Sequence, residues 1–126
     1  MAAPNIVAVT SIYGKSTFVS LTTTNATTLL SNTAGSGKVL KVNSIVVANT
    51  DGTNAVNFTL NYNTAAAGAG TNVELVSTVS VPANASLIAM DKSTSVYLEE
   101  NISLTVQAGT ASKLKVTVSY EEISAT

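Results

Sequence analysis

The chain lacks cysteine, histidine, tryptophan and arginine altogether. Without cysteine it has no disulfide framework, no thiolate metal site and no thiol nucleophile. Without histidine it has neither the usual general base nor the commonest metal ligand in proteins. Without arginine it has no planar guanidinium group for bidentate recognition of phosphate or guanine. These absences remove most of the side chains on which enzymes and nucleic-acid-binding proteins depend.

Charge is also scarce. Charged residues make up 10% of the 126 residues, against about 25% in an average soluble domain. The formal net charge of −1 provides no cationic surface for nucleic acid or for an anionic membrane. No apolar run reaches the ~20 residues needed to span a bilayer. Two explanations fit: a surface that is neutral but hydrated, or a surface covered by copies of the chain or by a scaffold.

Short segments of alternating apolar and polar residues, separated by turn residues, run through the whole chain. The clearest are residues 56–62 and 114–120, and no run of ten or more residues has helical periodicity. About eight to ten short strands at regular spacing are typical of an all-β sandwich. We therefore predict a single-domain, jelly-roll-like antiparallel β-sandwich. An immunoglobulin-like Greek key is the alternative, because periodicity does not separate the two.

Residues 38–62 contain two apolar runs on either side of Asp51-Gly52. This dipeptide is favoured in tight hairpin turns, in which both central residues take φ > 0. We therefore predict a long antiparallel hairpin at the centre of the fold. After Ser44 the alternation is broken by three consecutive apolar residues, at positions 45–47. Such a change of phase predicts a β-bulge, or a strand that passes from the edge of a sheet to its interior.

One end and one loop are the candidate contact segments. Residues 1–12 are interpreted as an N-terminal arm or first strand, a turn is expected at 13–15, and residues 13–126 form the sandwich domain. Both faces of the arm are apolar, which predicts burial, and the loop 63–72 is small, flexible and low in complexity, which favours an exposed contact loop. The candidate partner-contact residues are Ile6, Val7, Val9, Ile12, Tyr13, Ala66, Gly68 and Gly70.

Motifs for chemistry are absent or incomplete. Gly35-Ser36-Gly37-Lys38 resembles the end of a phosphate-binding loop. The motif also requires a glycine at position 32 and a Ser or Thr at position 39, but this chain has Asn32 and Val39 there. Neither acidic pair, at 99–100 or at 121–122, converges by itself, because adjacent residues of a strand point to opposite faces. A meeting of Glu99 and Glu121 across strands is the alternative left open. We therefore predict no catalytic, cofactor-binding or metal-binding residues.

Several segments together match a known pattern. They are P-N-I-V-A-V-T-S-I-Y-G-K (4–15), S-G-K-V-L-K-V-N-S-I-V-V-A-N-T-D-G-T-N-A (36–55), V-S-V-P-A-N-A-S-L (79–87), S-V-Y-L-E-E-N-I-S-L (95–104) and V-S-Y-E-E-I-S (118–124). The chain resembles small virion structural proteins of tailed bacteriophages, particularly those infecting marine cyanobacteria. The resemblance implies a β-sandwich assembled in many copies on a particle, and it brings no catalytic signature.

The composition and the resemblance favour a capsid decoration or cement protein. It would bridge major capsid subunits, associate with copies of itself as a homo-oligomer, and lie on the virion surface after assembly in the host cytoplasm. One alternative is a tail, neck or fibre component. Another is a carbohydrate-binding adhesion module, for which Tyr13 and Tyr97 are the candidate exposed rings. We expect no cofactor, no nucleic acid and no membrane partner, and a glycan is the least supported partner.

Overall fold

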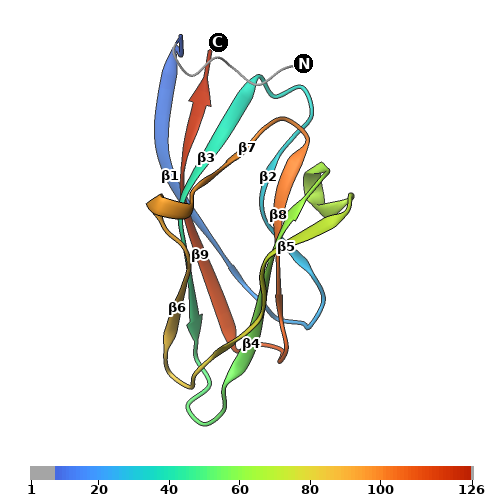
Figure 1. Ribbon diagram of the computed structural model, residues 1–126, viewed down its shortest axis with the longest axis vertical. Coiled ribbons are helices and arrows are strands. Elements are labelled where there is room, and N and C mark those ends of the chain that lie inside the picture. Colours follow the sequence, from blue (N-terminus) through green and yellow to red (C-terminus); the bar gives the residue numbers. More distant parts are fainter. Residues whose placement is uncertain (1–7, 126) are drawn as a thin grey trace.

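The computed structural model describes residues 8–125, which form two antiparallel β-sheets packed face to face (Figure 1). Within these residues, two short 3₁₀ helices, η1 (Ala66–Gly68) and η2 (Lys92–Thr94), lie in connections between strands. The strands are β1 (Ser11–Ser20), β2 (Thr27–Asn32), β3 (Lys38–Asn49), β4 (Val56–Asn63), β5 (Asn72–Val81), β6 (Ser86–Met90), β7 (Val96–Leu98), β8 (Ile102–Ala108) and β9 (Leu114–Ser124).

The strand order identifies a jelly roll. Sheet A has the order β1-β9-β3-β6, with β7 also paired to β3, and sheet B has the order β2-β8-β4-β5. The chain crosses between the sheets at almost every connection, as in a double-sheet jelly roll. An immunoglobulin-type sandwich instead pairs its first two strands in one sheet. Here β1 and β2 lie in different sheets, so the jelly-roll prediction is confirmed and the alternative is wrong.

One apolar core fills the space between the two sheets. Alternate residues of each strand point to the same side, so a strand with period-two hydrophobicity buries one face. In β4, Phe58 and Leu60 are fully buried, while Asn57 and Thr59 face outward. The predicted apolar faces of β4 and β9 are confirmed. The largest fully buried side chains are those of Phe58, Leu21, Ile45, Leu60, Leu98, Leu104 and Leu114.

The predicted central hairpin is wrong. β3 belongs to sheet A and β4 to sheet B, so Asp51-Gly52 lies in a connection that crosses between the sheets. Gly52 does not take the positive φ of a tight hairpin turn. Instead, the Asp51 carboxylate accepts hydrogen bonds from the backbone N–H groups of Thr53 (2.8 Å) and Asn54 (3.1 Å), which folds the connection locally. β3 and β4 each have an apolar face, and these faces lie on opposite sides of the core. The alternating pattern that suggested a hairpin is therefore also satisfied by two strands in opposite sheets.

Two smaller predictions have opposite outcomes. The bulge near Ser44 is confirmed, because the register between β3 and β9 shifts between Val42 and Ser44. The turn at residues 13–15 is wrong, because these residues lie within β1 and pair with residues 120–122 of β9. Residues 11 and 12 belong to the same strand as residue 13. The separate role of residues 1–12 as an arm stays a prediction, since residues 1–7 lie outside the described part.

One carboxylate links three strands of sheet A. Glu122 on β9 accepts hydrogen bonds from the Nζ atoms of Lys15 on β1 and Lys38 on β3, each at 3.1 Å. Burial opposes ionisation of Glu122, but the hydrogen bonds and positive charges of the two lysines outweigh it and lower the pKa of Glu122. The charged form is therefore the one that the folded protein stabilises.

This linkage predicts an acid-sensitive contribution to stability. Because the pKa of Glu122 is lowered on folding, its contribution is present above the pKa of the unfolded chain and is lost as the pH falls through the folded pKa. We expect Glu122→Gln to be less stable than the wild type at about pH 7 and equally stable well below about pH 4. Urea denaturation across this range measures the difference. The exposed Glu99→Gln is the control, and a difference for Glu122→Gln that does not change with pH would refute the linkage.

Candidate functional site

The two outer faces of the sandwich differ in chemistry. The outer face of sheet B is polar, and its residues are Asn57, Thr59, Asn61, Asn63, Ser103, Thr105 and Gln107 on β4 and β8. Exposed apolar side chains occur on both sheets: on sheet B they lie along the edge strand β5, at Val73, Leu75 and Val79, whereas on the outer face of sheet A they lie across several strands. Single exposed apolar residues are common on soluble proteins, but a contiguous group of them marks an interaction site.

Three exposed apolar residues lie in one row across the outer face of sheet A, with Thr117 between the first two of them. Phe18 on β1 lies opposite Thr117 on β9, and Thr117 lies opposite Val46 on β3, which in turn lies opposite Ile88 on β6. The exposed fractions are 72% for Phe18, 37% for Val46 and 66% for Ile88. We call Phe18, Val46 and Ile88 the apolar stripe. Register alone places these residues, distant in sequence, in one line across the sheet.

Apart from Lys115, small side chains flank the apolar stripe on both sides. The neighbouring row toward the N-terminal end of β1 consists of Ser16, Ser119 and Ser44, and the row on the other side consists of Ser20, Lys115 and Ala48. The hydroxyl oxygens of Ser16 and Ser119 lie 3.0 Å apart, within hydrogen-bond distance. Because serine and alanine project little, the large residues of the stripe stand above these neighbours.

The sequence alone does not identify the residues of the apolar stripe. One signal was present: with Ile45, Val46 and Val47 in succession, the alternation of a strand forces at least one of them to face outward. Val46 is that residue, because Ile45 and Val47 are fully buried. Phe18 and Ile88 gave no comparable signal, since only the pairing of strands shows that they share a row with Val46.

The predicted arm residues are only partly within the described structure. Ile6 and Val7 lie outside the described residues, and Val9 is half-buried just before β1. Ile12 and Tyr13 are 54% and 58% exposed. Ile12 lies on the outer face of sheet A and Tyr13 on the opposite side, because neighbours in a strand point in opposite directions. Their role in partner contact stays a prediction.

The loop between β4 and β5 is held against sheet B. Its helix η1 packs on β2 and β8. The backbone N–H of Ala67 donates to Ser31 Oγ at 3.0 Å, and that of Gly68 donates to Ser103 Oγ at 3.1 Å. A Cβ atom on Gly70 would lie 2.7 Å from the backbone nitrogen of Ala65, so glycine is needed to close the loop.

These contacts give the loop a defined conformation, unlike the flexible segment that its composition suggests. Ala66 and Gly68 are half-buried, and Gly70 is exposed. Whether these three residues contact a partner stays a prediction.

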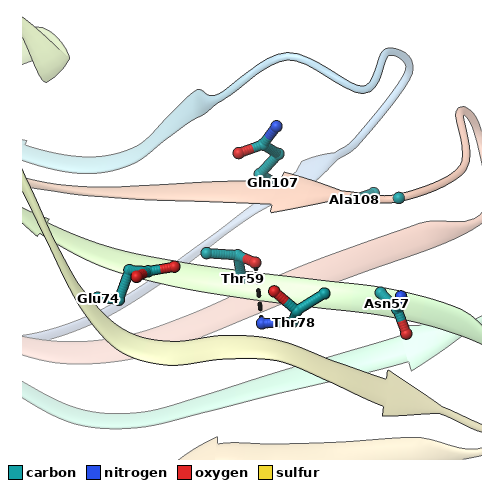
Figure 2. A pocket seen from close by; sticks show the side chains of 7 residues that line it. Asn57, Thr59, Glu74, Thr78, Gln107 and Ala108 are labelled. Carbon is teal, nitrogen blue, oxygen red and sulfur yellow. Dashed lines mark hydrogen bonds between the residues drawn. The ribbon is translucent and has the colours of Figure 1, made fainter.

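A shallow polar hollow of about 280 Å³ opens on the outer face of sheet B (Figure 2). Its lining residues are Asn57, Thr59, Glu74, Thr78, Gln107, Ala108 and Gly109. The backbone N–H of Thr78 donates to Thr59 Oγ1 at 3.1 Å, so part of the polar lining is already occupied. Glu74 is the one acidic group in the lining, and no aromatic ring joins it. The hollow therefore offers neither an acid–base pair nor a stacking platform.

The two candidate sugar-binding rings do not form one platform. Tyr97 shares a row with Lys41 and Glu121, whereas Tyr13 shares a row with Glu122. Glu121 and Glu122 are neighbours on one strand and point to opposite faces, so the two rings do so as well.

Over residues 8–125, no group of three or more acidic residues is placed to hold a metal ion. Within that same range, no helix is long and apolar enough to cross a membrane.

Comparison with known proteins identifies similar folds only. No protein-family model and no curated protein matches the chain. A subunit of the disulfide-linked pili of Bacillus endospore appendages has a TM-score of 0.52 at 13% identity, covering 92% of this chain and 90% of that one.

Two viral particles are more distant. The IBDV viral particle has a TM-score of 0.45 at 5% identity, over 91% of this chain and 31% of that one. The extra small virus of the prawn Macrobrachium rosenbergii has a TM-score of 0.41 at 12% identity, over 98% and 88%. At these identities the likeness to the pilus subunit establishes a shared fold, and the viral likenesses carry no further argument.

Proposed function

We propose that this chain is a non-enzymatic structural subunit of a tailed-phage virion, a capsid decoration or cement protein that bridges major capsid subunits. The observation that carries the proposal is the apolar stripe on the outer face of a jelly roll, because exposed apolar side chains grouped on one face suit contact between proteins. The resemblance of several segments to virion proteins of tailed phages is the reason for proposing a phage particle as the assembly. The same surface would also serve a tail, neck or fibre component.

Assembly of this chain would be non-covalent. The similar pilus subunit comes from disulfide-linked pili, whereas this sequence contains no cysteine. Many weak contacts repeated around a symmetric particle give high overall avidity, because each further contact forms at a high effective concentration. A subunit of this kind needs an exposed apolar contact and little charge, and both are properties of the chain.

Fractionation of particles tests the proposal and separates it from the tail alternative. Heads and tails purified separately from the phage that encodes the chain are analysed by mass spectrometry for its peptides. We expect the protein on tail-free heads, at a copy number comparable with the number of major capsid subunits. Detection with tails alone would replace the decoration role by the tail, neck or fibre role. Absence from both fractions would refute a virion role.

The N-terminal residues provide a second test. Removing residues 1–7 leaves every described strand intact, because β1 begins at Ser11. We expect this truncation to abolish binding to undecorated particles while the far-ultraviolet circular dichroism spectrum stays that of a β protein. The full-length double variant Ile6→Ser/Val7→Ser keeps the chain length and removes only these apolar side chains. It should show the same loss of binding if apolar contact is the cause. Undiminished binding of both variants would remove the arm from the proposal.

A further inference from the structure

The outer face of sheet A has the properties of a surface that binds its own copy. We propose that two chains pack these faces together around a two-fold axis that runs across the strands, between Thr117 and Ser119 of β9. The inference rests on the proposed assembly role and names the partner of the apolar stripe. In such an isologous contact the same surface serves both chains, so it must be complementary to itself.

The charges of β9 meet this requirement. Lys115 and Glu121 both lie on the outer face, each three positions from the residue that separates Thr117 and Ser119. A two-fold axis at that point reverses the strand and places Lys115 of one chain over Glu121 of the other, twice in the dimer. Opposite charges facing each other fix the register of a contact, whereas like charges would oppose it.

The shapes of the rows meet it as well. The same axis places the row of Phe18, Thr117 and Val46 over the row of Ser16, Ser119 and Ser44 of the second chain. Large side chains thus pack on small ones, in both directions. Lys41 lies in the row of Glu121 and faces Ala48 of the second chain, one strand away from the Lys115 that faces Glu121.

The size of the face predicts a weak dimer. Four strands ~4.8 Å apart and about nine residues long at ~3.3 Å each cover roughly 600 Å² per chain. That area is at the low end for specific protein interfaces, which typically bury about 800 Å² per partner. We expect dimers at tens to hundreds of micromolar in solution, which a multivalent particle would strengthen.

Sedimentation velocity of the full chain, from about 5 μM to about 1 mM, tests the proposal. The wild type should shift from monomer to dimer with concentration, and Phe18→Ser should weaken dimerisation at least about tenfold. Leu75→Ser is the matched control, because Leu75 is an exposed apolar residue on β5 of the other sheet, and it should dimerise like the wild type. Circular dichroism verifies that each variant is folded. A wild type that stays monomeric at the highest concentration, or a Phe18→Ser variant that dimerises normally, would overturn the proposal.

A charge exchange tests the two-fold arrangement itself. Lys115→Glu and Glu121→Lys should each weaken dimerisation, because each brings like charges together across the axis. The double variant Lys115→Glu/Glu121→Lys restores the opposite pairing and should dimerise like the wild type. A double variant no better than the single ones would show that these residues do not face each other. This measurement needs no particle, so a dimer that forms while particle fractions lack the protein would refute the virion role and leave the dimer established.

Discussion

Replacing Phe58 with alanine should lower the free energy of unfolding by about 3–5 kcal/mol. Phe58 is fully buried on β4, where it lies opposite Val79 of β5 and Ala108 of β8. Removing the ring deletes apolar surface and leaves a cavity, because the hydrogen-bonded ladders on both sides keep β4 from moving inward. Domains are typically stable by only about 5–15 kcal/mol, so this single change removes about a fifth of the total or more.

The same substitution on the outside provides a matched control. Phe18→Ala removes an identical side chain from β1, but Phe18 is mostly exposed and contributes little to the core. Its unfolding free energy should stay within about 0.5 kcal/mol of the wild type. Urea denaturation followed by circular dichroism measures both variants. Equal losses at the two positions would mean that Phe18 is a core residue, and the outer face of sheet A would then lose its place as a contact surface.

These two phenylalanines show what the sequence can and cannot predict. Phe58 lies in a strictly alternating segment, in which Asn57 and Thr59 define the polar face, so its burial follows from the residues alone. Phe18 lies between Thr17 and Val19, where no alternation marks either face. Its exposure becomes evident only when β1 is found at the edge of sheet A, paired with β9 alone among the described strands.

Long-range pairing also explains the failed hairpin. Asp51-Gly52 is a local signal, and it does produce a local turn through hydrogen bonds to the Asp51 carboxylate. Whether the strands beyond such a turn pair with each other depends on competing partners. β3 pairs with β9, β6 and β7, and β4 pairs with β5 and β8, so each already has a partner on both sides. No local pattern contains that information.

The conformation of the predicted loop 63–72 lies beyond the sequence for a different reason. Its alanines and glycines are typical of a flexible segment, but the residues that hold it lie elsewhere in the chain. Ser31 and Ser103 come from β2 and β8, and their hydroxyl groups accept hydrogen bonds from the loop backbone. A polar outer face on sheet B is therefore explained in part by this loop. Serine side chains that the sequence suggests are exposed to solvent instead accept hydrogen bonds from the backbone of this loop.

Asn63 is the residue on which this loop depends most, and Asn63→Ala should destabilise the protein by about 2–4 kcal/mol. The Asn63 side chain is fully buried. Its Oδ1 accepts hydrogen bonds from the backbone N–H groups of Ala65 (3.1 Å) and Gly70 (2.8 Å), and its Nδ2 donates to Gly70 O (3.2 Å) and Asn72 Oδ1 (2.7 Å). Truncation removes the partners of the Ala65 and Gly70 N–H groups in a partly buried site, whereas Asn72 Oδ1 still accepts from Thr105 Oγ1 (3.0 Å). Each unpaired group costs about 1–3 kcal/mol.

The loss should appear first as opening of the loop. Hydrogen exchange at the amides of Ala65 and Gly70 should accelerate in Asn63→Ala before the core strands are affected, because local opening requires less free energy than global unfolding. Asn57→Ala is the matched control, since Asn57 lies on the same face of β4 but is exposed. Unchanged exchange at both amides in Asn63→Ala would mean that the serine hydroxyls hold the loop without Asn63. If the loop contacts a partner, Asn63→Ala should also weaken particle binding without weakening the dimer formed through the apolar stripe. That result would assign separate roles to the loop and to the outer face of sheet A.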